Sequence, residues 1–461
     1  MTVHSTRHIV SFAIVITLVA AASSVMPAHA QGLTPDQETA LRGIARGESP
    51  AWPAMSPEQS KALFEKSEQQ LKDHQAYCLP HGLSVDVFWT DYSRSKPFRY
   101  ETIGDSACWA GHYLAAIALR YKVTKDPQAL QDVKNVLEKF DLLTRVSGRV
   151  GYIARYAGAA NNEAYREYYK VYGRGEDPER PGLGKCAYQG VEPYTDLVWL
   201  GNSSRDTYDG TSFGLATAWV YVDDPDTRQQ IKTIVETIGK RLVEDEYWVI
   251  DGKGHKTNPT PSFKLCWMRL LSSVSPEVFA DVKKEYYTLV GDAIARGGRV
   301  YPVTYKEYFA NNLNFIRMYT LTMLEDDPAT KAGLQEVLRK SYHELADTLN
   351  PHFAAIYLDA TGDTDAKAIA VLQGQLIDMP APPRYFKKVD YRNNPAYEKR
   401  EDNPELLKYA LLSRERPESD FIWQRSPVLS HRDEDVPYET PGIDLFLPYW
   451  MGRECGHIPA P

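Results

Sequence analysis

Apolar positions along the chain alternate between two helical patterns, and this alternation repeats. A mostly apolar helix is followed by a turn that ends in Asp-Pro, and then by a helix whose apolar residues are spaced three and four positions apart. The three copies are residues 111–144, 211–244 and 311–344. Asp accepts hydrogen bonds from the first N–H groups of a helix, and Pro suits the first helical position. The pattern therefore predicts a repeated helical hairpin.

Weaker copies extend the repeat. Residues 263–272 and 277–293 flank a turn that ends in Ser-Pro, and residues 352–360 and 364–376 flank a Thr-Gly-Asp turn. The period is about fifty residues, with one hairpin in each. One hairpin is missing between residues 146 and 204, where the chain is rich in Gly, Tyr and Asn, and this stretch predicts a long excursion.

The two helices of each hairpin differ in polarity. Val133, Val136 and Phe140 lie on one face of a second helix and polar residues on the other, whereas first helices have few polar positions. We therefore expect an inner ring of buried first helices and an outer ring of amphipathic second helices. Over roughly residues 100–376 the chain resembles the six-hairpin glycosidase superfamily, the (α/α)6 toroids. The resemblance implies an all-α toroid of helical hairpins with long loop insertions, and it favours a carbohydrate substrate.

The chain is expected to form one toroidal domain with flanking segments. The expected parts are a signal peptide (1–30), an N-terminal helix and lead-in segment (31–100), the helical-hairpin toroid (101–376) and a wrapping and closing segment of the same domain (377–461). Within the flanks, residues 57–77 predict an amphipathic helix, residues 81–89 an extended segment and residues 405–412 a short helix.

The first thirty residues have the order of a cleavable signal peptide. Arg7 precedes an apolar run over residues 9–22, and Ala28-His29-Ala30 forms a small-residue cleavage site. The apolar run is too short to span a bilayer comfortably. We therefore expect an exported protein, periplasmic or extracellular, without a stable membrane anchor. A retained N-terminal anchor is the alternative.

Charge and cysteine content narrow the expected partners. The formal net charge is −8, and no Lys-rich or Arg-rich tract suggests a nucleic-acid groove, so no nucleic-acid partner is expected.

The five cysteines include no C-x-x-C pair, which gives a zinc ribbon or dithiol site no support. Cys108 and Cys266 are expected to be buried, and any disulfide would involve Cys78, Cys186 or Cys455. Dinucleotide, P-loop, H-E-x-x-H and G-x-S-x-G motifs are missing from the sequence, so we expect no cofactor and no metal.

Polar residues gather where the predicted first helices begin. If these helices form an inner ring, their N-terminal ends meet at one mouth. The residues expected on its rim are Asp105, Asp206, Asp209 and Asn312. Cleavage of a glycosidic bond uses a proton donor and a second carboxylate, so the three Asp residues are the predicted catalytic groups.

The electrostatics of these acids point in two directions. Asp206 and Asp209, close together and partly buried, would raise one pKa as a general acid requires, whereas Arg205 and the helix N-terminus favour the ionised form. Plain helix capping is the alternative reading, and it is strongest for Asp105 because Asp is a preferred N-cap residue.

Other residues at the helix starts and in the excursion suit substrate binding. The predicted substrate-binding residues are Trp109, His112, Trp199, Arg205, Tyr208, Asn311 and Asn312. Residues 151–202 are rich in Tyr and lead directly into the acid cluster, and flat rings with a polar edge suit stacking on sugars. Packing inside the body is the alternative for these rings. His255 is assigned to a surface turn without a role.

The paired carboxylates favour an exported glycoside hydrolase acting on a poly- or oligosaccharide. A lyase on uronic-acid-containing glycans stays open, with Tyr208, His112 and Arg205 in its chemistry. Sugar epimerases on the same kind of toroid, and a non-catalytic glycan-binding or scaffold protein, are further alternatives. The signal peptide argues against a cytoplasmic epimerase, and a scaffold has no need of acids gathered at equivalent helix starts.

Overall fold

The structure is a computed structural model that describes residues 32–159, 187–301, 308–419 and 426–461. Helix accounts for 55% of these residues and strand for 9%, which agrees with the expected mainly α-helical class. The predicted signal peptide, residues 1–30, lies outside the described residues. Within the described part, no helix is both long and apolar enough to cross a membrane.

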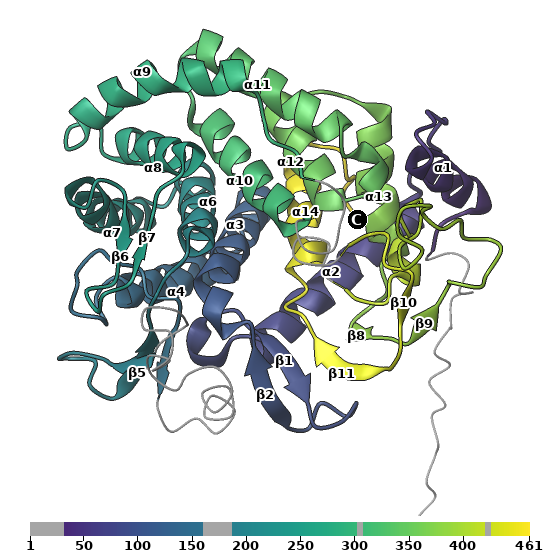
Figure 1. Ribbon diagram of the computed structural model, residues 1–461, viewed down its shortest axis with the longest axis horizontal. Coiled ribbons are helices and arrows are strands. Elements are labelled where there is room, and N and C mark those ends of the chain that lie inside the picture. Colours follow the sequence, from purple (N-terminus) through teal and green to yellow (C-terminus); the bar gives the residue numbers. More distant parts are fainter. Residues whose placement is uncertain (1–31, 160–186, 302–307, 420–425) are drawn as a thin grey trace, which may run out of the picture.

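Five helix pairs follow one another along the chain, as the repeat predicts (Figure 1). The pairs are α3 (Ser106–Thr124) with α4 (Pro127–Leu143), α6 (Arg205–Tyr221) with α7 (Pro225–Glu244), α8 (Pro261–Val274) with α9 (Ala280–Arg296), α10 (Tyr308–Leu324) with α11 (Pro328–His343), and α12 (Pro351–Thr361) with α13 (Ala366–Asp378). Asp126, Asp224 and Asp327 cap α4, α7 and α11 through their side chains, each followed by Pro. The Asp-Pro turns are therefore helix starts, as predicted.

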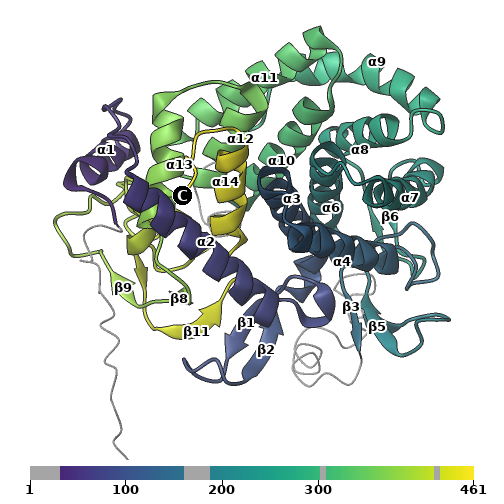
Figure 2. The ribbon, with the colours of Figure 1, turned by 180° about the vertical axis from the view of Figure 1, so that it is seen from behind.

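First helices are buried, and the second helices are amphipathic except α13, in which residues 370–378 are all buried. Every residue of α3 from Ser106 to Leu119 is buried, whereas α4 buries one face that includes Val133, Val136 and Phe140. In Figures 1 and 2, α3, α6, α10 and α14 (Ile443–Glu454) lie toward the middle of the molecule, and α7, α9, α11 and α13 lie toward its outside.

The buried helices contact one another in chain order. α3 packs against α6, α6 against α8, α8 against α10, α10 against α12, α12 against α14, and α14 returns to α3. The backbones of α3 and α6 are in direct contact. A Cβ atom added at Gly111 would overlap the backbone of Gly210, and one added at Gly214 would overlap the backbone of Gly111. Glycine at these positions lets two helix backbones touch.

The last helix corrects the expectation for the C-terminal segment. Residues 443–454 fall in the expected closing segment, for which no full helix is predicted, but they form α14, which packs against α3, α12 and α2 (Pro57–Tyr77). The helix expected at residues 405–412 is wrong, since Leu406 and Leu407 instead form isolated bridges with Leu429 and Lys399. α2 has the predicted bounds, and a further helix, α1 (Pro35–Ala45), precedes it.

Small antiparallel sheets lie where buried helices begin. The strands are β1 (Asp86–Trp89), β2 (Pro97–Glu101), β3 (Ala157–Ala159), β4 (Ala187–Gln189), β5 (Leu197–Leu200), β6 (Val249–Ile250), β7 (Lys256–Thr257), β8 (Tyr385–Phe386), β9 (Val389–Asp390), β10 (His431–Arg432) and β11 (Val436–Glu439). They pair in the orders β2-β1-β11-β8, β3-β5-β4, β10-β9 and β6-β7. In chain order β5, β7 and β11 directly precede α6, α8 and α14, and β2 precedes α3 with only a short 3-10 helix (Ile103–Asp105) between them. These sheets therefore direct the chain into the starts of four buried helices, and β1, β2, β5 and β11 lie along one side of the molecule in Figure 1.

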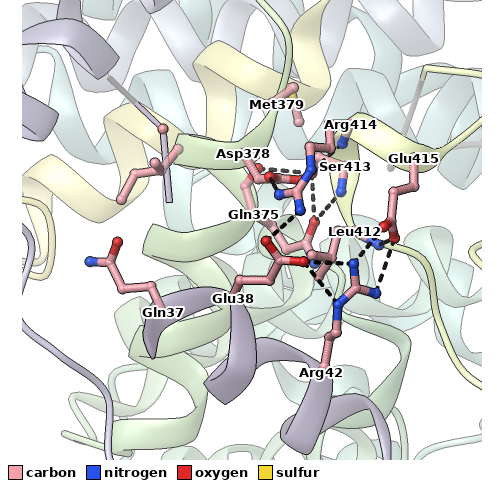
Figure 3. A network of polar contacts seen from close by, with 12 residues as sticks. Gln37, Glu38, Arg42, Gln375, Asp378, Met379, Leu412, Ser413, Arg414 and Glu415 are labelled. Carbon is pink, nitrogen blue, oxygen red and sulfur yellow. Dashed lines mark hydrogen bonds and ion pairs between the residues drawn. The ribbon is translucent and has the colours of Figure 1, made fainter. Parts of the chain in front are cut away.

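A network of charged side chains ties α1 to the C-terminal segment (Figure 3). Arg42 pairs with Glu38 at 2.8 Å and with Glu415 at 2.5 Å. Arg414 pairs with Glu38 at 2.6 Å and also with Asp378 at the end of α13. The wrapping segment is thus held by ion pairs both to α1 and to the end of α13, and Arg42 and Arg414 share Glu38.

Four cysteines lie in the described part, and all are free thiols. Cys108 and Cys266 are fully buried, as predicted. Cys78 and Cys455 form no disulfide, and Cys186 lies outside the described residues. The surface turn expected around His255 is present, because residues 251–255 connect the antiparallel strands β6 and β7 and residues 252–254 are exposed. The His255 side chain itself is buried, and its Nδ1 lies 2.5 Å from Asp251 Oδ2.

Candidate functional site

The N-terminal halves of α3, α6, α10 and α12 bring polar side chains together inside the molecule. α3 and α6 supply acids and a His, and α10 and α12 supply an Arg, an Asn and a second His. The residues are Asp105, His112, Asp206, Asp209, Asn312, Arg317 and His352. Three of these seven, Asp105, Asp206 and Asp209, are the predicted catalytic groups. Contacts between the helices, described next, show which of the seven meet.

Asp206 lies in the first turn of α6 but does not cap it. Ser204 is the N-cap residue, and its hydroxyl accepts a hydrogen bond from the Thr207 N–H. Burial and then the charges of Asp209 and Asp105 raise the pKa of Asp206 to about 6, against the opposing charges of Arg317 and Arg155. The Asp206 carboxyl is therefore held beside two other acids, one on its own helix and one at the start of α3.

Asp105 occupies the N-cap position of α3, yet its side chain makes no capping hydrogen bond. Its carboxylate instead pairs with Arg155 at 3.2 Å, and the Arg155 guanidinium also donates to the carbonyl oxygens of Gly104 and Asn202. The side chain of Asp105 is 17% exposed. Helix capping, the alternative to a catalytic role, is thus not what the Asp105 and Asp206 carboxyl groups do.

Asp209 lies one turn deeper in α6 and is fully buried. One of its oxygens accepts a hydrogen bond from the Arg317 guanidinium of α10, while Oδ1 has no hydrogen-bond partner among the described residues. Burial raises the pKa of Asp209, and Arg317 opposes that shift. The ion pair joins α6 to α10, three positions after Asp206 along α6.

His112, two turns into α3, is held in one tautomer. Its Nδ1 lies 2.9 Å from the Cys108 carbonyl oxygen, which can only accept, so Nδ1 carries the proton. Nε2 is then an acceptor, and the Asn312 amide donates to it at 3.2 Å. Burial lowers the pKa of His112 to about 4, so the imidazole is neutral at ordinary pH. This contact joins α3 to α10.

Trp109 lies against His112, with ring centroids 5.2 Å apart, and is 4% exposed. A small cavity of about 10 Å³ separates Trp109 from the start of α14, where Gly442, Ile443 and Asp444 line it. A space of that volume holds about one water molecule. Trp109 therefore packs between the site and α14, and its contact with a sugar stays a prediction.

Four predicted substrate-binding residues are engaged in contacts outside this cluster. The Tyr208 hydroxyl accepts a hydrogen bond from the Ile153 N–H, and Trp199 donates to the Gln189 carbonyl oxygen; both side chains are buried. Arg205 donates to Asn258, and Asn311 exchanges hydrogen bonds with the Tyr301 backbone. These contacts give all four a packing or positioning role, and sugar contact by any of them stays a prediction.

The excursion before α6 is only partly described. Tyr152 and Tyr156 are buried in the core, and Tyr188 packs against Trp199 with centroids 4.9 Å apart. The tyrosines at positions 165, 168, 169 and 172 lie outside the described residues. The idea that this segment supplies stacking rings stays a prediction.

Sequence reasoning missed two residues of the cluster, Arg317 and His352, and also Arg155, which pairs with Asp105. His352 lies in the first turn of α12, capped by Asn350, so the rule that marked the other helix starts also marks this one. Arg155 and Arg317 carry no comparable mark, because their partners lie 50 and 108 positions away in the sequence.

No model of a known protein family matches this chain. A search of curated proteins likewise finds no similar sequence. The function of the chain must therefore be inferred from the chemistry of the Asp105, Asp206 and Asp209 cluster and its surroundings.

Proposed function

We propose that the chain is an exported glycoside hydrolase in which Asp206 is the general acid. The observation that carries the proposal is the setting of the Asp206 carboxyl, partly buried beside Asp105 and Asp209, where its pKa rises to about 6. A general acid must hold its proton near the working pH, and a carboxyl with a normal pKa does not. Two like charges and burial are the causes expected for such a group.

The other two acids fit supporting roles. Asp105, paired with Arg155 and partly exposed, is the second carboxylate that activates water or attacks the anomeric carbon. Asp209, buried and bound to Arg317, contributes a fixed negative charge that keeps the proton on Asp206. Three acids in distinct environments thus divide the work that glycosidic cleavage requires.

We also infer that the helices close into an (α/α)6 toroid. The contacts from α3 through α6, α8, α10, α12 and α14 back to α3 support six inner helices. α4, α7, α9, α11, α13 and α2 are the matching outer helices, since each packs against an inner one. The resemblance to six-hairpin glycosidases supports carbohydrate chemistry on this architecture, with the site at the N-terminal ends of the inner helices.

A hydrolase fits the site better than a lyase. The lyase alternative relied on Tyr208 as a proton carrier, but this hydroxyl is buried and bound to the Ile153 N–H. It also needs a cation for the uronate carboxylate, and Arg155 and Arg317 are each already paired with an Asp. Arg205, the cation first considered for that task, donates to Asn258.

Incubation with a panel of neutral and uronic polysaccharides tests the proposal. We expect new reducing ends without unsaturated products, and a loss of at least about 100-fold in rate for Asp206→Asn, the size typical of a lost general acid. Asp226→Asn is the matched control, because Asp226 occupies the same first-turn position in the outer helix α7 and should keep full activity. Unsaturated uronates would identify a lyase, and equal activity of the Asp206→Asn variant would remove Asp206 from the mechanism.

A further inference from the structure

His352 is a buried imidazole without a hydrogen-bond partner. Its side chain is 0% exposed, and neither Nδ1 nor Nε2 bonds to any residue in the described part of the chain. The His112 and Phe213 rings lie beside it, with centroids 6.2 and 6.5 Å away. Burial lowers the pKa of His352 well below its ordinary value, so the ring is neutral, with one donor and one acceptor.

Two neighbouring helices of the same cluster also present unpartnered atoms. Asn312, whose amide nitrogen donates to His112, has a fully buried Oδ1 without a partner in the described chain. Asp209 Oδ1 on α6 is also buried and has no hydrogen-bond partner in the described chain. The three side chains come from α6, α10 and α12. The links from Asn312 to His112 and from His112 to His352 place Asn312 and His352 around one interior region, and Asp209 is joined to α10 through Arg317.

Burial does not by itself leave an imidazole unpartnered in this protein. His74 on α2 is equally buried, and its Nδ1 also has no partner in the described chain, but its Nε2 lies 3.2 Å from the hydroxyl of the buried Ser84, whereas neither nitrogen of His352 is bonded. A buried polar atom without a partner costs about 1–3 kcal/mol of stability, so each such atom in a folded protein calls for an explanation, such as an ordered water, an ion or a functional role. The unmade bonds of His352 and Asn312 therefore point to a ligand that makes them.

We propose that His352 and Asn312 form the floor of the sugar-binding site and bind hydroxyl groups of a neutral sugar ring. The inference rests on the proposed function and deepens it. A hydroxyl donates and accepts at once, so it can satisfy Asn312 Oδ1 and either imidazole nitrogen. A uronate carboxylate accepts only, and here it would meet the acceptor oxygens of Asn312 and Asp209 while Arg317 is already occupied.

Thermal unfolding without any ligand gives the first test. His352→Phe removes two unsatisfied atoms and keeps a ring of similar size, so Tm is expected to stay equal or rise. His74→Phe is the contrast, because it leaves Ser84 without a partner and should lower Tm by several degrees. A fall in Tm for His352→Phe as large as that for His74→Phe would overturn the proposal, since the imidazole would then already be bonded in the free protein.

Binding gives the second test, in the Asp206→Asn background to prevent turnover. Oligosaccharides from xylan, mannan and β-glucan are the neutral probes, and those from polygalacturonate and alginate are the uronic ones. We expect calorimetry to detect a neutral probe whose Kd weakens at least about 10-fold in His352→Phe, the effect of about 1.4 kcal/mol. His352→Gln, which keeps a donor and an acceptor, should recover part of that loss.

The outcomes separate the two proposals. Tighter binding of the uronic probes than of the neutral ones would refute the proposal that His352 and Asn312 bind a neutral sugar. Equal affinity of the His352→Phe variant and its parent for the neutral probes would refute it as well. Neither result would affect the proposal that Asp206 is the general acid. Hydrolysis by the wild type with KM unchanged in His352→Phe leads to the same conclusion. Binding that depends on His352 without any hydrolysis would refute the proposed hydrolase activity but support sugar binding by His352 and Asn312. Absence of both binding and hydrolysis would refute both proposals.

Discussion

Replacing Asp209 by Asn should lower the pKa of Asp206. Asp206 and Asp209 lie three positions apart on α6, a spacing that puts their Cβ atoms about 5–6 Å apart. At about 6 Å and an effective dielectric of about 20–40, two unit charges interact by about 1.5–3 kcal/mol, which is about 1–2 pKa units. The loss of Asp209 also leaves the Arg317 charge uncompensated, which acts on Asp206 in the same direction.

The expected result is a fall in the pKa of Asp206 from about 6 to about 4–5. Burial, the largest cause of the shift, stays in place, so the value should not reach that of an exposed Asp. Carbon-13 NMR of protein labelled at the Asp carboxyl carbon measures the titration without a substrate, and the Asp206→Asn difference spectrum assigns the signal. In a pH–rate profile the alkaline limb should move down by the same amount, because a general acid is inactive once ionised.

A double variant that also replaces Arg317 tests the same electrostatic effect if the Asp209→Asn variant is unstable. Removal of one partner from a buried ion pair costs about 3–5 kcal/mol, so Asp209→Asn should unfold more easily than the wild type. The double variant Asp209→Asn, Arg317→Gln removes the raising and the lowering charge together, and the pKa of Asp206 should return toward about 6. A pKa that is unchanged or higher in the single variant, or equally low in both variants, would contradict the electrostatic account.

Two further predictions concern the rest of the molecule. Asp359 accepts a hydrogen bond from Tyr319, and burial, with Glu454 adding to the effect, raises its pKa to about 7. The folded state therefore holds this proton more tightly than the unfolded state, and stability falls as pH rises from about 4 to about 7. Asp359→Asn should be more stable than the wild type at pH 8 by about 1–3 kcal/mol and lose that advantage near pH 4, as urea unfolding measures; an equal difference at both pH values would refute the assignment. Expression in a bacterial host should place the protein in the periplasm or medium with its N-terminus near Gln31, and an uncleaved membrane-bound chain on N-terminal sequencing would refute export.

The hairpins could be predicted because the sequence signals of their helix starts act over only a few residues. Asp-Pro at a helix start satisfies the first N–H groups within three residues, as Asp224 does for Thr227, whatever the rest of the chain does. The burial of α3 was predictable for a similar reason, since a helix with so few polar positions has no face for solvent.

Elements that depend on distant partners could not be predicted in this way. α14 is buried on nearly all sides, so its residues show no helical periodicity, and its place against α3 depends on positions more than 300 residues earlier. Residues 405–412 have a helical pattern, but Leu406 and Leu407 pack with Val428 and pair with other segments instead. Tertiary contacts override local propensity in both places.

The candidate site also contains residues that could be predicted locally and residues whose place depends on distant contacts. Asp105, Asp206 and Asp209 could be named from helix starts, and the expected conflict between like charges and an Arg is present. The partner is Arg317, however, and not the neighbouring Arg205, which turns to Asn258. The sequence could not show which Arg faces the acids, because that depends on the packing of α6 against α10.

A crystal structure of the Asp206→Asn variant with a neutral oligosaccharide that the wild type cleaves tests the central claim most directly. We predict the glycosidic oxygen within about 3 Å of the side chain at position 206, with Asp105 on the other side of the bond. An oligosaccharide bound at any other part of the molecule, with residue 206 out of reach of the bond, would contradict the proposal that Asp206 is the general acid.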